Sequence, residues 1–94
     1  MTAMTRIRCE TRPGLSPRNV VAGVGDVYGK RHFMLVDRDF LAVRDGVPYL
    51  PVGVVVRDKE KGVALIEFAE EADSGAWRAW VPLQDLLENS ETPT

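Results

Sequence analysis

Residue types that carry acid–base, nucleophilic or metal chemistry are scarce in this chain of 94 residues, which has one cysteine and one histidine. The histidine, His32, would serve as a general base if Asp37 or Asp39 oriented its ring. No Ser or Cys lies at a spacing that makes it the nucleophile for this base, so we interpret His32 as a residue on the surface of a strand. The sequence therefore offers no catalytic residue and favours a protein that is not an enzyme.

The single cysteine, Cys9, lies between Arg8 and Glu10 on a segment of alternating polarity, and we expect it to be a small buried apolar residue. One Cys and one His cannot complete a closed zinc site or a disulfide. We expect no metal and no cofactor. A free thiol fits a reducing compartment, and no run of about 20 apolar residues or secretory signal is present. These features predict a cytoplasmic protein without a membrane partner.

The string Ala72–Ala76 reads Ala-Asp-Ser-Gly-Ala and is similar to the catalytic loop of retroviral-type aspartic proteases. In that family one Asp per subunit contributes to a dyad that shares a proton and activates water. There the loop follows an apolar strand and much of the barrel comes after it. Here Glu70 and Glu71 precede the loop, and only residues 77–94 follow it. Asp-Ser-Gly is also the composition of a turn, which is our interpretation.

The two tryptophans define the candidate binding surface. Trp77 and Trp80 are three residues apart on an expected strand, Ala76–Val81, so their side chains point to opposite faces. We expect Trp77 in the core with Ala79 and Val81, and Trp80 on an outer apolar face. The candidate binding residues on this face are Trp80, Arg78, Leu65, Val55 and Arg57. The alternative is that the N-terminal strand, or Leu86 and Leu87, covers Trp80.

Alternation with a period of two runs through most of the chain and predicts β-strands. The expected strands are Thr5–Thr11, Val20–Val24, Arg31–Val36, a pair around Asp45 and Gly46, Val52–Arg57, Val63–Phe68 and Ala76–Val81, with a single helical turn at Leu83–Leu87. Asp37-Arg38-Asp39 is expected to be a capped turn. Asp45-Gly46 predicts a type I′ hairpin turn, and Gly62 predicts the left-handed residue of the next hairpin.

The hairpin around Gly62 is the clearest expected element. The expected register pairs Lys59 with Val63, Arg57 with Leu65, Val56 with Ile66 and Val54 with Phe68. The face that this register makes entirely apolar consists of Val54, Val56, Ala64, Ile66 and Phe68, and we expect it to be core.

These elements predict an all-β fold, a small single-domain barrel of five to six short antiparallel strands over residues 1–88, with a flexible tail at 89–94. From Val52 onward the order is twisted hairpin, polar loop, short strand and helical turn. This order resembles the second half of SH3-like barrels, as in KOW modules and photosystem accessory subunits, and implies that fold. An OB-like barrel is the alternative.

The formal net charge of −2 hides a basic first part and an acidic second part. Residues 1–57 hold nine basic and five acidic side chains, and residues 58–94 hold three basic and nine acidic ones. Such a split arises from a basic binding face or from complementarity within the fold, and we favour the second explanation.

The favoured function is protein–protein association, mainly self-association, through the apolar outer face around Trp80. The first alternative is nucleic-acid binding. It would use Arg6, Arg8, Arg12, Arg18, Lys30 and Arg31 on phosphates, with His32, Tyr28 or Trp80 stacking on bases. The second is an enzyme whose site is assembled across an oligomer. The run of elements resembles plasmid-borne dihydrofolate reductases, although residues 77–81 replace the polar strand motif that lines their pore.

Overall fold

The computed structural model describes residues 5–88, so the expected tail at 89–94 lies outside the described residues. The secondary structure is almost entirely β, which confirms the predicted all-β class. The strands are β1 (Thr5–Arg8), β2 (Glu10–Pro13), β3 (Asn19–Gly25), β4 (Arg31–Asp37), β5 (Ala42–Arg44), β6 (Val47–Asp58), β7 (Val63–Glu67), β8 (Arg78–Pro82) and β9 (Leu86–Glu88). Two short 3-10 helices complete the fold, η1 (Arg38–Phe40) and η2 (Leu83–Asp85).

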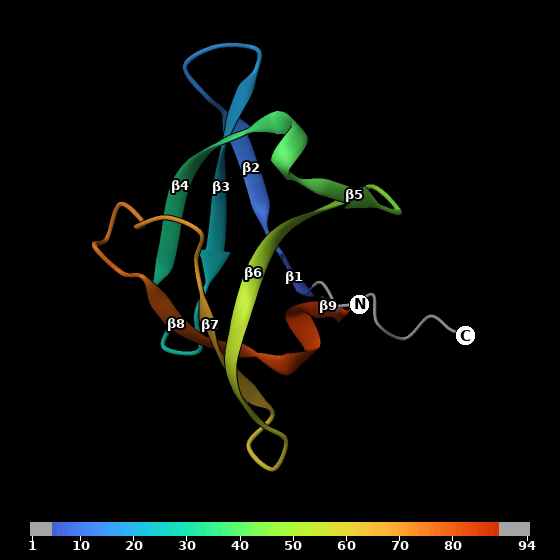
Figure 1. The fold of residues 1–94 in the computed structure, drawn as a ribbon, viewed down its shortest axis with the longest axis vertical. Coiled ribbons are helices and arrows are strands. Elements are labelled where there is room, and N and C mark those ends of the chain that lie inside the picture. Colours follow the sequence, from blue (N-terminus) through green and yellow to red (C-terminus); the bar gives the residue numbers. More distant parts are fainter. Residues whose placement is uncertain (1–4, 89–94) are drawn as a thin grey trace.

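The strands form two antiparallel sheets, which are not closed into a barrel (Figure 1). The larger sheet has the order β8-β7-β6-β1-β9, and β5 also pairs with β6. The smaller sheet has the order β2-β3-β4. The long strand β6 pairs with β5 and β1 along its first half and with β7 along its second half, so it spans most of the larger sheet.

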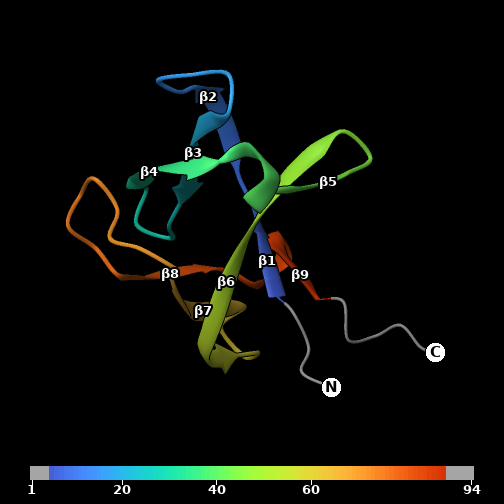
Figure 2. The same cartoon turned by 45° about the horizontal axis from the view of Figure 1, so that its top comes forward.

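The predicted strand Thr5–Thr11 divides at Cys9 into β1 and β2 because its two halves pair with different sheets. β1 lies between β6 and β9, whereas β2 pairs with β3. At the division the Cys9 N–H donates to the carbonyl of Pro48, 3.1 Å away. Figure 2 shows β1 and β2 as one nearly continuous path from the larger sheet to the smaller one.

The predicted turns are confirmed. Asp45 and Gly46 both have positive φ, 54° and 79°, as a type I′ turn requires, and Gly62 has φ 69°. Asp37 caps η1 by accepting a hydrogen bond from the Asp39 N–H. These turns could be predicted because the residues that form them are adjacent in the sequence.

The core lies between the two sheets and consists mainly of aliphatic side chains. The largest fully buried side chains are Ile7, Leu50, Ile66, Val24 and Val81. Cys9 is buried, as expected, and Phe68 is the one buried residue among the Phe, Tyr and Trp residues of the described chain. Both tryptophans lie outside the core, so its cohesion comes from small, closely packed side chains.

The expected register of the hairpin β6–β7 is wrong by one residue between the turn and Val56, and by a second residue beyond a β-bulge. Val56 pairs with Leu65 and Val54 pairs with Ile66, and the register shifts between them, leaving Val55 as the extra residue. A bulge of one residue reverses the face on which the following side chains lie. Val56 is therefore 44% exposed rather than in the core, whereas Ala64, Ile66 and Phe68 are buried as expected.

The expected core position of Trp77 is also wrong. β8 begins at Arg78, so Trp77 belongs to the preceding loop, and its side chain is 51% exposed. Only its carbonyl joins the sheet, where it accepts a hydrogen bond from the Phe68 N–H at 2.9 Å. Ala79 and Val81 are buried, as the alternation predicts.

The sequence does not reveal the last strand. The expected helical turn at Leu83–Leu87 is shorter, three residues of 3-10 helix, and β9 then pairs Leu86 with Ile7 and Leu87 with Arg6. The partner of β9 is the first described strand, almost eighty positions away, and local patterns carry no signal for such pairing.

Gly62→Ala should destabilise the protein by about 1 kcal/mol, because an L-residue is strained at positive φ although no atom lies within 4 Å of the added Cβ. The matched control is Gly53→Ala on β6, where the nearest atoms lie 3.9 Å away. This control should be neutral or stabilising by up to about 1 kcal/mol. Urea denaturation of both variants measures the difference, and equal stabilities would contradict the assigned turn.

Candidate functional site

The first candidate site is a row of apolar side chains across three strands of the larger sheet. Leu65 on β7 lies opposite Val56 on β6 and opposite Trp80 on β8. Directly opposed residues share a face of the sheet, and these three lie on the face away from the core. Val56 is exposed, and Leu65 and Trp80 are half-buried. We call this row, Val56, Leu65 and Trp80, the outer face.

An ion pair borders the outer face on one side. Glu67 lies opposite Arg78, and the Arg78 Nε is 3.7 Å from a Glu67 carboxylate oxygen. Both side chains are about half exposed, so the pair stabilises the fold by at most about 1 kcal/mol. The larger consequence is that charges of both signs flank the apolar row on this side.

The structure brings together three of the five residues that the sequence indicated. Trp80, Arg78 and Leu65 lie on adjacent positions of β7 and β8. Val55 is the bulge residue and has no ladder partner, and Val56 occupies the place expected for it. Arg57 lies opposite Ala64 instead of Leu65, because Asp58 rather than Lys59 pairs with Val63 and the turn is one residue longer than expected. The sequence reasoning missed Val56, and only the bulge would have indicated it.

The alternative cover expected for Trp80 included Leu86 and Leu87. Both lie on β9, which pairs with β1 at the other end of the larger sheet from β8. The backbone of Trp80 instead contacts the turn between β3 and β4. The Val27 N–H donates to the Trp80 carbonyl at 2.9 Å, on the edge of β8. This contact ties β8 to that turn, and the Trp80 side chain is half-buried.

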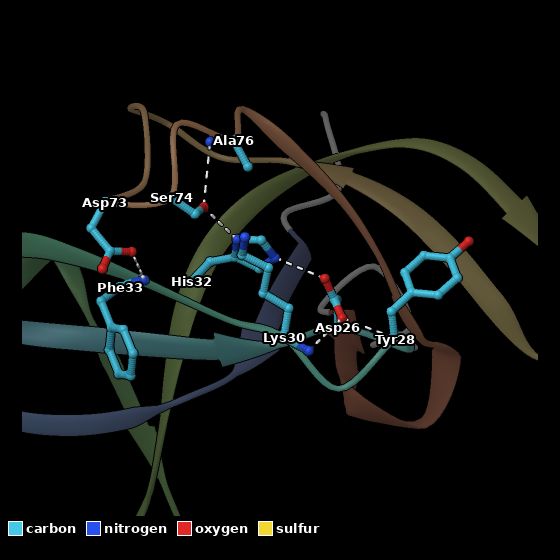
Figure 3. A network of polar contacts seen from close by, with 8 residues as sticks. All are labelled: Asp26, Tyr28, Lys30, His32, Phe33, Asp73, Ser74 and Ala76. Atoms are coloured by element: carbon cyan, nitrogen blue, oxygen red, sulfur yellow. Dashed lines mark hydrogen bonds and ion pairs between the residues drawn. The ribbon is translucent and has the colours of Figure 1, made fainter.

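The second candidate site is a network of polar side chains centred on His32, and it joins three segments (Figure 3). The His32 Nε2 lies 2.9 Å from a carboxylate oxygen of Asp26, and the His32 Nδ1 lies 2.7 Å from the Ser74 hydroxyl. The side chains of His32 and Asp26 are only 5% and 9% exposed, whereas Ser74 is exposed. A buried base therefore bridges a buried acid and a surface hydroxyl.

Asp26 is fixed by the turn that it begins. Its second carboxylate oxygen accepts hydrogen bonds from the N–H groups of Tyr28 and Lys30, at 2.8 and 2.9 Å. Gly29 has positive φ and closes this turn between β3 and β4. The carboxylate thus has one oxygen committed to the backbone and the other to the imidazole.

Ser74 reaches His32 because the Asp-Ser-Gly loop is held against β4. The Asp73 N–H donates to the Phe33 carbonyl, and the Phe33 N–H donates to the Asp73 carboxylate, at 2.8 and 2.9 Å. Gly75 has a φ of 87° and its N–H donates to the Ala72 carbonyl, as in a turn. Asp73 therefore docks the loop, and Ser74 follows it into contact with the ring.

Two expectations for His32 are wrong. It is buried rather than on the surface, because it shares the inner face of β4 with Met34 and Val36. Its acid partner is Asp26 rather than Asp37 or Asp39. The hydroxyl that contacts the ring belongs to Ser74, which is 42 positions away along the chain and which spacing did not reveal. The string Ala72–Ala76 is the only sequence feature that includes this serine, and its composition predicts a turn.

The surroundings shift the pKa of two groups. Burial by itself raises the pKa of Asp26, but the hydrogen bonds from His32 and from two backbone N–H groups lower it overall. Asp26 is therefore an anion at neutral pH. Burial, reinforced by the Glu10 carboxylate, raises the pKa of the Cys9 thiol to about 11. The Cys9 thiol is thus protonated at neutral pH and a poor nucleophile.

A cavity of about 560 Å³ lies where the smaller sheet meets the turn between β5 and β6 and the end of β8. Its lining includes Gly23 and Gly25 of β3 and charged side chains of both signs. Glu10 and Arg31, which pair at 3.2 Å, are among these. Asp26 also lines it, so the cavity reaches the acid end of the His32 network and does not include Ser74.

Comparison of the chain with protein-family models, with curated proteins and with solved structures found no match. Within residues 5–88, no helix is long and apolar enough to span a membrane. The same residues contain no group of three or more His, Cys, Asp or Glu side chains that would hold a metal ion. The function is therefore argued from the two sites described above.

Asp26→Ala should destabilise the protein by about 1–3 kcal/mol at pH 7, because it leaves the buried His32 Nε2 without its partner. The pKa of Asp26 is lower in the folded state than in the unfolded one. Its contribution is therefore present above about pH 4 and is lost as the pH falls through the lower, folded pKa. Urea denaturation from pH 7 to below pH 4 should show the wild type and the variant converging.

The matched control is Asp58→Ala, since Asp58 accepts one exposed backbone hydrogen bond, from Lys61. This change should cost about 1 kcal/mol or less. If Asp26→Ala were no more destabilising than Asp58→Ala, the buried network would not stabilise the fold.

Proposed function

We propose that this protein is an SH3-like β-domain that associates with a second copy of itself through the outer face. The association is isologous, so Val56, Leu65 and Trp80 of one copy pack on the same residues of the other. No catalytic step belongs to this function. The result of the association is an assembly of two copies, which brings their other surfaces together.

The observation that carries this proposal is the position of the large apolar groups. Val56 is exposed, and Trp80 is half-buried beside Leu65, while the core contains mostly aliphatic side chains. Apolar side chains left in water on one sheet face gain free energy when a partner covers them. Tryptophan and arginine are also among the residue types enriched at the energetic centres of protein interfaces.

The charges beside the outer face suit a second copy as the partner. Glu67 and Arg78 occupy opposed positions beside the row, next to Leu65 and Trp80. A two-fold axis parallel to the strands, between β7 and β8, would place Arg78 of each copy over Glu67 of the other. A surface with paired opposite charges is self-complementary in this way, whereas a face with one sign would repel its own copy.

The SH3-like assignment is supported by the order of the elements. The hairpin β6–β7, the polar loop, β8 and η2 follow one another as in the second half of SH3-like barrels. The chain then returns in β9 to pair with β1, so that its last described strand lies beside its first. The insertion of β2, β3 and β4 between β1 and β6 adds the smaller sheet.

Val56→Asp should weaken self-association at least 100-fold, because a carboxylate buried at the interface has no partner. Val56 is exposed on β6, so the change should leave the fold intact. Trp80→Asp should have the same effect on association, and circular dichroism checks the fold of both variants. Sedimentation velocity over a micromolar concentration series measures the association.

The control is Leu15→Asp, which introduces the same charge at an 88% exposed apolar residue in the loop between β2 and β3. It should associate as the wild type does. A wild type that stays monomeric at high micromolar concentration would end the self-association proposal, as would a folded Val56→Asp variant with unchanged association.

A second candidate function, binding of single-stranded nucleic acid, is favoured by one observation on the smaller sheet. The Arg12 guanidinium lies over the Phe33 ring, 4.6 Å from its centroid. Phe33 in turn covers Gly23, where a Cβ would lie 2.7 Å from the ring. An aromatic ring and a guanidinium on a sheet face are groups on which bases stack. His32 is buried and cannot stack, and Arg31 is paired with Glu10.

Under this second candidate, a fluorescent oligonucleotide should bind at about 50 mM salt and weaken about 20-fold by about 200 mM, for three phosphate contacts. Phe33→Ala should reduce the affinity, and Val56→Asp on the other sheet should leave it unchanged. Fluorescence anisotropy measures both. Absence of binding at the lower salt concentration would exclude nucleic acid as the ligand.

A further inference from the structure

We propose that Ser74 is a nucleophile, activated by His32 and Asp26, that accepts acyl or phosphonyl groups from small activated esters. This activity is separate from self-association, because Ser74 lies in the loop between β7 and β8 and not on the outer face. The two proposals therefore depend on different residues, and the failure of one does not overturn the other.

The hydrogen bonds of the network have one consistent direction when the imidazole is neutral. The Ala76 N–H donates to the Ser74 Oγ, 3.4 Å away. The Ser74 hydroxyl then donates to the His32 Nδ1, and the His32 Nε2–H donates to the Asp26 carboxylate. This is the order of donors that general-base activation of a serine requires: the base accepts from the hydroxyl, and an anion orients the base.

The burial of the three groups suits the same role. The side chains of His32 and Asp26 are almost inaccessible to water. The imidazole is therefore oriented by its hydrogen bonds to Asp26 and Ser74 rather than by water. Asp26 is held in place by the N–H groups of Tyr28 and Lys30, and its lowered pKa keeps it anionic. An anion beside the Nε2–H stabilises the imidazolium that forms when the Nδ1 takes a proton. Ser74 is exposed, so a reagent can reach its oxygen.

The step balances with the groups present. The Ser74 Oγ attacks the carbonyl carbon of an ester, a C–O bond forms, and the hydroxyl proton moves to the His32 Nδ1. The tetrahedral intermediate then expels the alcohol, which takes that proton, and Ser74 carries the acyl group. Water attacks the acyl-serine by the reverse proton path, releasing the acid and restoring the hydroxyl. The net reaction is ester and water to acid and alcohol.

A purely structural network would show the same distances without reactivity, and this difference is measurable. Ser16 is the internal reference, since it is also exposed and its hydroxyl oxygen accepts a backbone N–H, that of Arg18. The single histidine of the chain contacts Ser74 instead. The two serines therefore differ in that the imidazole of His32 faces Ser74 and not Ser16.

The test is to incubate the full chain with a fluorophosphonate and to locate the adduct by peptide mass spectrometry over time. In this reaction the serine oxygen bonds to phosphorus, fluoride leaves, and the proton passes through His32 to solvent. General-base assistance predicts that Ser74 is labelled at least about 100-fold faster than Ser16. His32→Gln should reduce labelling of Ser74 to the rate of Ser16, and Ser16→Ala should leave it unchanged.

Circular dichroism establishes that His32→Gln is folded before its rate is compared. The comparison of Ser74 with Ser16 within the wild type needs no variant, so it decides the matter even if His32→Gln does not fold. Equal labelling of the two serines, or no adduct on Ser74, would overturn the proposal and leave the network as a structural link between the two loops.

Discussion

The bulge at Val55 is the constraint on which the outer face depends. In a strand, successive side chains alternate between the two faces, so one extra residue reverses every position that follows it. Val54 therefore faces inward against Ile66, and Val56 faces outward beside Leu65. Without the bulge, Val56 would be in the core and the outer face would lack its third member. A single inserted residue thus moves an apolar side chain from the core to the proposed interface.

The same architecture holds the His32 network together. The path from β1 into β2 joins the two sheets, and the loop after β7 returns to lie against β4 through Asp73 and Phe33. His32 is the point at which that loop and the turn between β3 and β4 meet. A buried polar network must be fully satisfied to be tolerated, and here each partner of the imidazole is itself fixed by backbone hydrogen bonds. The network is thus rigid at its acid end and open to water at its hydroxyl end.

The features that could be predicted from the sequence are local ones. The turn at Asp45 and Gly46, the left-handed residue Gly62 and the capped turn at Asp37 each depend on neighbouring residues. Strand alternation and the expected hairpin were sufficient to place three residues on one outer face, Trp80, Leu65 and Arg78. The bulge could not be predicted, since three consecutive valines look alike to any periodic pattern. The contacts of His32 with Ser74, and of β9 with β1, join segments that only the folded chain brings together.

The central claim, that the outer face is covered by a second copy, is tested most directly by residue-resolved NMR on dilution. Spectra of the wild type from high to low micromolar concentration would report each amide separately. Self-association through the outer face predicts concentration-dependent shifts at Val56, Leu65 and Trp80, including the Trp80 indole N–H, and none at Leu15. Spectra that do not change with concentration, or changes confined to other surfaces, would contradict it.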